Sequence, residues 1–371
     1  MRGRSKITWH SVQLFIVYCM LSIMGYFNLY SAVLNSRYTR LPNSQIIWIA
    51  AGIIMIFFTV FVLEKIKIGK FILPLLLIMI AALSMLLIFG ETWGDSKRWF
   101  STPFGGLQPS EFAKPALVVV LSFLYANSGN FRKMNLINFI ITVIVAGLVA
   151  IEPDLGTSLV YLFVYFVFFL FTEPKKRVIF VFILTVILLI VVVFYFGLKD
   201  YQRERITAFL NPSTNPDGYY QTKQSLTMIA SGGLTGKGYQ RGPGNLYGYI
   251  PADHTDFVLA VFAEENGFYG MLVFYGLWFV FFINCILLFL KRSSFKKWMI
   301  LGIFSIFFIQ FTINIGMVLG LLPVTGLPLP FFTYGGSSTI SNSISTGILI
   351  WCSMKEFTYD RGVARVEDYK R

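Results

Sequence analysis

A carboxylate stands at the start of a long apolar segment in the stretch GYIPADHTDFVLAVFAEENGFYG, residues 248–270. Asp256 follows Pro251, Asp253 and His254, and the apolar residues begin directly after it. Asp is a good helix N-cap, and a carboxylate also suits a general base that is partly removed from water. The two roles are compatible, because a base anchored at a helix start is rigidly placed. We take Asp256 as the candidate base and His254 as a candidate substrate-binding residue.

Other carboxylates have neighbours that suggest pairing or capping. Glu111 and Lys114 lie three residues apart, which places them on one face of a helix. They either form a structural ion pair that fixes helix packing or line a polar cavity and support chemistry there. Asp154, in the stretch EPDLG, either caps the following helix or supports the same polar region.

Several cations could neutralise the oxygens of a phosphate group. Guanidinium groups bind phosphate oxygens in a bidentate manner, although they could equally anchor the protein to the headgroup of any lipid. The candidates are Arg98, Arg203, Arg205 and Lys237, and Arg241 is a further cation beside a Gly-rich stretch.

Two Gly-rich stretches accompany these cations. SGGLTGKGYQRGPG, residues 231–244, is not a nucleotide-binding P-loop, because that motif needs Gly where the chain has Ser231 and Ser or Thr where it has Gly238. Its backbone could still cradle a diphosphate. TYGGSS, residues 333–338, with Ser337 as a candidate substrate-binding residue, either does the same or lets two backbones approach closely.

The apolar segment after Asp256 contains Glu264 and Glu265. In a continuous helix they would lie ~12 Å beyond Asp256, which predicts a buried structural or cavity-lining role for at least one of them. The sequence has no metal-ligand cluster and no Ser/His/Asp arrangement, so we assign no metal ligands. The Cys residues lack metal-ligand spacing and are expected to be small buried hydrophobes: Cys19, Cys285 and Cys352.

Composition identifies the elements that must hold these residues. The chain has 371 residues, of which 56% are hydrophobic and 13% are charged, whereas soluble proteins carry about 25% charged residues. Uncharged runs such as residues 178–197 reach the ~20 residues that cross a bilayer as a helix. The chain is therefore predicted to be an all-α polytopic membrane protein, with a single transmembrane domain over residues 1–371.

About ten segments are predicted to span the membrane. The eighth is long enough to tilt or to project beyond the bilayer. The predicted spans are residues 11–33, 46–63, 71–90, 111–127, 136–151, 156–172, 177–197, 256–290, 298–322 and 336–354.

Lys and Arg residues orient these spans. Most lie at the N-terminus and in the loops after the even-numbered spans, which makes both termini cytoplasmic, including the tail 355–371. These loops explain the net charge of +13 without a nucleic-acid partner. The loops rich in Gly, Pro and polar residues then converge on the extracytoplasmic face, above all the long loop 198–255, and any active site should face outward.

Several stretches, taken together and in order, resemble the SEDS family of RodA, FtsW and SpoVE. They cover about residues 93–345 and read RWF, QPSEFAKPAL, EPDLGTSL, YQRERITAFLNP, SGGLTGKGY, PADHTDFVLAVFAEENGFYG and NIGMVLGLLPVTGLPLPFFTYGGSS. DYQRERITAFLNP and GYYQTKQSLTMIASGGLTGKGY are more similar to RodA than to FtsW. One departure from the family pattern is Glu152, where the family commonly has Gln.

The resemblance implies a peptidoglycan glycosyltransferase of cell elongation that polymerises lipid II outside the cytoplasmic membrane. It implies a catalytic role for Asp256 and a supporting role for Glu111 and Lys114, with a class B penicillin-binding protein crosslinking the strands. The GlcNAc 4-hydroxyl of the acceptor would attack C1 of the donor MurNAc with inversion, and undecaprenyl diphosphate would leave. Its charge would be met by a divalent ion such as Mg²⁺ or Mn²⁺, or by cations: Arg98, Arg203, Arg205 and Lys237.

Other classes of protein fit part of this pattern. A lipid II flippase would also have about ten spans and a polar cavity, although a transporter needs polar groups leading to both faces of the membrane. A non-enzymatic membrane protein that only activates its penicillin-binding protein is a further alternative. The division-type paralogue FtsW shares most of the motifs and is therefore a further alternative to the elongation-type protein.

Overall fold

The computed structural model describes residues 7–34, 38–93, 96–102, 105–172, 174–177, 179–180, 184, 200–213, 215–246, 256–292 and 294–354. Most of the predicted seventh span (177–197), the candidate residue His254 and the predicted cytoplasmic tail (355–371) lie outside these residues.

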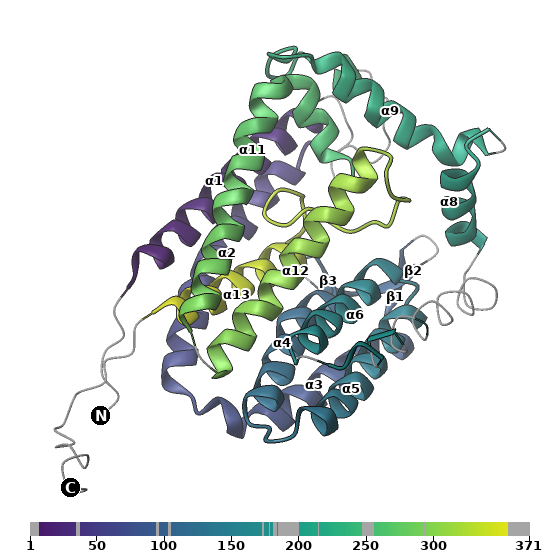
Figure 1. Ribbon diagram of the computed structural model, residues 1–371. Coiled ribbons are helices and arrows are strands. Elements are labelled where there is room, and N and C mark those ends of the chain that lie inside the picture. The colour runs from purple at the N-terminus through teal and green to yellow at the C-terminus, as the bar shows by residue number, and fades with distance from the viewer. Residues whose placement is uncertain are drawn as a thin grey trace, which may run out of the picture.

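The described part of the chain is mostly helical, and helices occupy the other predicted spans (Figure 1). Their ends differ from the predicted ends by a few residues; α2, for example, begins at Leu41 rather than at residue 46. The helices are α1 (Trp9–Ala32), α2 (Leu41–Lys65), α3 (Ile72–Phe89), α4 (Pro109–Ala126), α5 (Phe131–Ile151), α6 (Leu155–Leu170), α8 (Asp200–Leu210), α9 (Pro216–Gly232), α10 (Pro243–Leu246), α11 (Val258–Lys291), α12 (Ser294–Val318) and α13 (Gly336–Ser353).

Among the described helices, six are long and apolar enough to cross a membrane, namely α1, α2, α3, α5, α11 and α12. α6 is apolar but shorter. The chain is therefore a multi-pass membrane protein, and the number of ten spans remains a prediction.

α13 is buried although it is rich in Ser and Thr. The Ser343 hydroxyl donates to the Thr339 carbonyl at 2.7 Å, and the Thr346 hydroxyl donates to the Asn342 carbonyl at 2.9 Å. Bonds to the carbonyls of the helix itself satisfy these hydroxyls where water is excluded. A polar helix can therefore occupy the centre of the bundle, out of contact with lipid.

A small antiparallel sheet corrects the all-α prediction. Its strands are β1 (Glu91–Trp93), β2 (Ser96–Thr102) and β3 (Gly105–Leu107), in the order β1-β2-β3. Trp99 pairs with Glu91, and Phe100 pairs with Leu107. The sheet lies in the connection from α3 to α4, where pairing satisfies backbone groups that no helix can satisfy. The connection between the predicted third and fourth spans is therefore partly sheet, and α4 begins at Pro109.

The polar connections gather at one end of the bundle. Figure 1 shows β2, β3, α8 and α9 at the end away from the first residues of α1 and the last residues of α13. Hydrogen bonds join the β2 strand to the α5–α6 connection and α8 to the α12–α13 connection. The described parts of these connections therefore lie at one end of the bundle, while their position on the extracytoplasmic side remains a prediction. The described part of the predicted loop 198–255 contains the helices α8, α9 and α10.

α11 is not one continuous span, in contrast to the predicted eighth span. The backbone breaks at Gly267, with φ 61° and ψ −161°, and Figure 1 shows the helix bent near its start. The Gly-rich segment 231–238 packs against this break. Amides of Lys237 and Gly238 donate to the carbonyls of Glu264 and Glu265 at 3.0 and 2.9 Å. These amides therefore cap the short first part of α11.

Both buried acidic residues of this short helix have structural partners. Glu264 accepts hydrogen bonds from the Ser231 hydroxyl at 3.1 Å and from the Gly244 amide at 3.1 Å. Glu265 accepts a hydrogen bond from the Ser31 hydroxyl of α1. The predicted structural role is confirmed, and Glu264 ties the Gly-rich segment to α11.

Candidate active site around the α12–α13 loop

The loop between α12 and α13 (residues 319–335) lies beside Asp256. A Cβ placed on Gly326 would lie 3.9 Å from the Asp256 Oδ2 atom, and Gly326 has a φ of 73° that other residues rarely adopt. The Asn314 side chain of α12 donates to the Asp256 carbonyl at 3.3 Å and to the Leu327 carbonyl at 2.9 Å. Asn314 therefore fixes Asp256 and the loop relative to each other, with the Asp256 side chain half-buried.

Two other elements flank the same loop. Arg205, exposed on α8, donates to the Val324 carbonyl at 3.4 Å. On the α6 side, a Cβ on Gly156 would lie 2.9 Å from Leu327 Cγ and 3.1 Å from the Thr325 carbonyl oxygen. The loop consequently brings the Asp256 carboxylate, the Arg205 guanidinium and the start of α6 around one short segment, residues 324–327.

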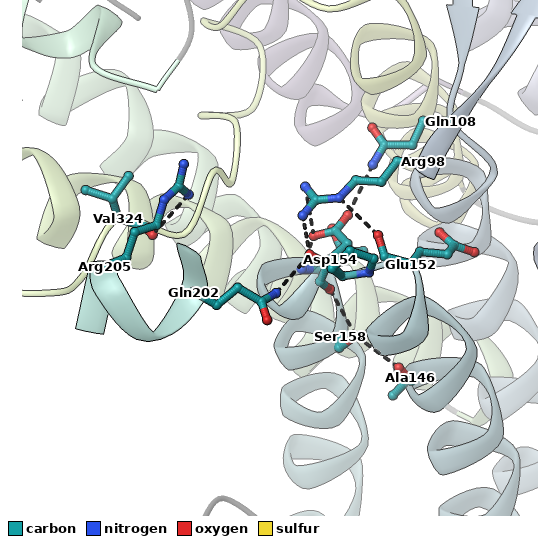
Figure 2. Close-up of polar contacts among 11 residues, drawn as sticks. Arg98, Gln108, Ala146, Glu152, Asp154, Ser158, Gln202, Arg205 and Val324 are labelled. Atoms are coloured by element: carbon teal, nitrogen blue, oxygen red, sulfur yellow. Dashed lines mark hydrogen bonds and ion pairs between the residues drawn. The ribbon is translucent and has the colours of Figure 1, made fainter. Parts of the chain in front are cut away.

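Arg98 clamps the turn that leads into α6 (Figure 2). Its guanidinium donates to the carbonyls of Glu152, at 3.3 Å, and of Pro153, and it lies 3.9 Å from the Asp154 carboxylate. Gln202 of α8 donates to the same Pro153 carbonyl at 3.2 Å. The Arg98 guanidinium, which was predicted to bind phosphate, therefore binds the turn at residues 152–154.

Asp154 is the N-cap of α6, as one of the two sequence interpretations held. Its carboxylate accepts from the Thr157 amide at 3.2 Å and from the Gln108 side chain at 3.1 Å. Gln108 lies directly before α4, so this carboxylate joins the starts of α4 and α6. The capping and supporting roles are thus compatible.

Glu152 is buried beside this cluster, with none of its surface exposed. Its carboxylate oxygens have no hydrogen-bond partner among the described residues, and Figure 2 shows the side chain pointing away from Arg98. The pKa of the Glu152 carboxyl is raised to about 8, chiefly by burial and then by the Asp154 charge, while Arg98 acts in the opposite direction. At neutral pH this carboxyl is mostly protonated.

Replacing Glu152 by Gln should stabilise the protein increasingly as the pH rises from about 5 to 8. In the unfolded chain the carboxyl titrates near 4.5 and in the native protein near 8, so between these values the unfolded state loses the proton first and native stability falls. Gln cannot ionise, which removes a penalty of a few kcal/mol at most. The measurement is the apparent melting temperature of the unaltered protein and of Glu152→Gln from pH 4.5 to 9. The difference between the two should grow with pH and become constant above pH 8.

The matched control for this experiment is Glu204→Gln, on the exposed face of α8. Its melting curve should follow that of the unaltered protein across the whole pH range. If the melting temperature of Glu152→Gln also follows that of the unaltered protein at every pH, ionisation of Glu152 does not destabilise the protein.

Glu111 and Lys114 form the predicted ion pair. The Lys114 ammonium lies 2.7 Å from the Glu111 carboxylate, and both side chains are almost fully buried in the first turns of α4. The Ser341 hydroxyl of α13 donates to the Glu111 carbonyl at 2.6 Å, and the Tyr161 hydroxyl of α6 donates to the Ser110 carbonyl at 2.6 Å. The pair therefore sits where α4, α6 and α13 meet.

Ser337 links the sheet to α4 and α13. Its hydroxyl accepts from the backbone N–H of Gln108 at 3.0 Å and donates to the Gly106 carbonyl at 3.2 Å. These bonds hold the backbone of the TYGGSS stretch close to residues 106–108. Close approach of two backbones was one of the two interpretations of this stretch. The substrate-binding role predicted for Ser337 remains a prediction.

The remaining candidate cations differ in placement. Arg203 is half-buried on α8, and Lys237 and Arg241 are exposed near the break in α11. His254 lies outside the described residues. Within the described part of the chain no three His, Cys, Asp or Glu side chains are grouped as metal ligands. The divalent ion, Mg²⁺ or Mn²⁺, that the sequence allowed for the leaving diphosphate remains a prediction.

Sequence reasoning missed residues that organise this site: Gln108, Gln202, Asn314 and Gly326. Asn314 could have been singled out, because an amide within an apolar span normally has a partner inside the protein. The roles of Gln108 and Gln202 depend on the distant turn at residues 152–154, and no local pattern marks them.

Comparisons with known proteins agree on one family. The family model of cell cycle proteins named for FtsW, RodA and SpoVE matches residues 6–357. The peptidoglycan glycosyltransferase MrdB of Escherichia coli (strain K12) is 36% identical over 267 residues, which are 71% of this chain and 72% of the relative. The probable peptidoglycan glycosyltransferase FtsW of Trichlorobacter lovleyi is 32% identical over 285 residues, 75% of this chain and 74% of the relative.

Solved structures have the same fold. A chain from a structure on the coordination of polymerization and crosslinking by a peptidoglycan synthase complex matches with a TM-score of 0.74 and 27% identity, over 94% of this chain and 97% of that chain. The rod shape determining protein RodA of Thermus thermophilus matches with a TM-score of 0.69 and 25% identity, over 94% of this chain and 96% of that chain.

Proposed function

Because the chain belongs to the cell cycle protein family of FtsW, RodA and SpoVE, we propose that it is a peptidoglycan glycosyltransferase that polymerises lipid II, with Asp256 as its general base. The two relatives described above carry the name peptidoglycan glycosyltransferase and align over most of the chain. The proposal adds the substrate, the base and the side of the membrane.

One observation carries the assignment of the base. Asp256 lies against the 324–327 segment, at the same end of the bundle as Arg205 and the Arg98–Asp154 pair. Asp256 lies two residues before the start of α11 and contacts the same loop segment that Arg205 contacts. A carboxylate and a cation that share one short segment suit proton removal next to a leaving anion.

In the proposed reaction, the GlcNAc 4-hydroxyl of the acceptor attacks C1 of the MurNAc at the donor's reducing end. Asp256 takes the hydroxyl proton as the new C–O bond forms, and the bond from C1 to the diphosphate oxygen breaks. Undecaprenyl diphosphate leaves with the bonding electron pair, so the anomeric centre inverts without a covalent enzyme intermediate.

Arg205 is the cation best placed for the leaving diphosphate, because its guanidinium is exposed and beside the loop at Asp256. Arg203 and Lys237 are further candidates on the same side. Arg98 acts indirectly in this scheme, since its donors hold the 152–154 turn. No step is routed through a metal ion.

The site is proposed to face outward, with both termini in the cytoplasm. The support is the distribution of Lys and Arg along the loops. A class B penicillin-binding protein is the proposed partner, and a related chain occurs in a peptidoglycan synthase complex.

The proposed role in elongation rests on the stretches that resemble RodA. A bacterial strain that lacks its own RodA should therefore regain rod shape when it expresses this chain.

The decisive experiment uses purified full-length protein in liposomes with labelled lipid II, with and without a class B penicillin-binding protein. Glycan polymer should form without ATP or an ion gradient, because departure of the diphosphate drives the reaction. Movement of lipid II between leaflets without polymer would instead identify a transporter. Polymer that forms only through the partner's own activity would leave this chain as an activator.

A further inference from the structure

A basic cavity of about 450 Å³ lies at the end of the bundle opposite Asp256. Its lining residues come from the start of α1 and from the ends of α11 and α13. Its polar lining consists of Thr8, His10, Lys291, Arg292 and Ser353, and Trp9 also borders it. The proposed glycan chemistry uses none of these residues.

The cavity concentrates positive charge. Lys291 and Arg292 are both basic, and no Asp or Glu is among the lining residues. The cavity also receives the N-terminus of α1, which is capped by the Thr8 side chain. The start of a helix carries a partial positive charge and attracts anions.

His10 holds Lys291 at the cavity. Its Nδ1 atom lies 2.7 Å from the Asn284 Oδ1 atom, and its Nε2 atom lies 3.1 Å from the Lys291 ammonium. An ammonium group can only donate, so Nε2 accepts, and the ring proton is on Nδ1 and is donated to Asn284. Neutral His10 therefore orients the Lys291 charge without opposing it.

Arg292 contributes a donor that the described residues leave unused. One of its terminal nitrogens donates to the Ser353 carbonyl at the end of α13. Its Nε atom is buried and has no hydrogen-bond partner among the described residues. A buried donor without a partner is costly, and an anionic oxygen in the cavity would remove that cost.

The surroundings of the cavity are those of a membrane interface. Ile7 and Trp9 are about 70% exposed, at 71% and 69%, and Leu290 is equally exposed on α11. Trp is enriched where helices meet the headgroups of a bilayer. Basic pockets between transmembrane helices suit anionic headgroups. We propose that this cavity binds the phosphate group of an anionic membrane lipid, with the acyl chains along α1 and α11.

The test compares lipid retention by the purified full-length protein, measured by native mass spectrometry with phosphatidylglycerol, phosphatidylcholine or inorganic phosphate. The unaltered protein should retain phosphatidylglycerol in preference to the other two. The double variant Lys291→Gln/Arg292→Gln should bind it roughly thirtyfold more weakly, as expected when two basic residues are lost beside a headgroup. Lys291→Arg should retain most of the binding, because it keeps the charge.

The matched control is Lys296→Gln/Lys297→Gln, which removes the same charge at the same end of the bundle. These ammonium groups stack over the rings of Trp351 and Phe289 and do not line the cavity. The control should bind phosphatidylglycerol like the unaltered protein. Equal losses in both double variants, or equal retention of the neutral lipid, would overturn the proposal, and tight binding of inorganic phosphate alone would replace the lipid with a soluble anion.

Discussion

Asp256→Asn is expected to lower lipid II polymerisation by about 10²–10⁴-fold while the protein still folds. The amide has the size of the carboxylate, so it fits beside Gly326, and the Asp256 carbonyl keeps its bond from Asn314. An amide cannot accept the proton of the attacking hydroxyl. Polymer from labelled lipid II, separated by gel electrophoresis, measures the loss, and the melting temperature reports folding.

The control for Asp256→Asn is the same substitution at Asp217, an exposed residue in the first turn of α9. Asp217→Asn should polymerise lipid II at the normal rate. If Asp256→Asn retained near-normal polymerisation at an unchanged melting temperature, Asp256 would not be the base.

Glu111 and Lys114 are expected to behave as one unit, which gives the second large effect. Lys114→Met leaves a carboxylate buried without its cation, and Glu111→Gln leaves an ammonium buried without its anion. Breaking a buried pair in this way costs about 3–5 kcal/mol. Each single variant should therefore lose most of its activity and stability.

The double variant Glu111→Gln/Lys114→Met should lose little more than either single variant, because no unpaired charge remains. The melting temperature and the polymerisation rate of all four proteins complete a double-mutant cycle. Lys133→Met, at an exposed position of α5, controls for the loss of a positive charge. Losses that simply add would show that the two side chains act independently.

The sequence predicted most of the helical spans because a bilayer sets their length and composition. The prediction was least direct for α13, because this helix is rich in polar Ser and Thr residues. Their hydroxyls bond to carbonyls of the same helix. The small sheet was missed, because its strands are only a few residues long and depend on pairing with each other.

Residue types and local spacing also identified the Glu111–Lys114 pair and the cap at Asp154, since each involves partners within one helical turn. The break in α11 was not predicted. An isolated Gly267 in an apolar run is compatible with a continuous helix, and the break depends on hydrogen bonds from the Gly-rich segment some thirty residues earlier.

Only the tertiary structure decided which groups lie together. Arg98 meets the Glu152 carbonyl across 54 positions of the chain, and Arg205 meets Val324 across 119. Periodicity reports the face of a helix on which a side chain lies, but it carries no information about which distant loop covers that face. The sequence by itself therefore determined the class of protein and its candidate residues. The packing of α6, α8 and α12 around the 324–327 segment decided that Asp256 and Arg205 contact the same loop, while Arg98 binds the turn before α6.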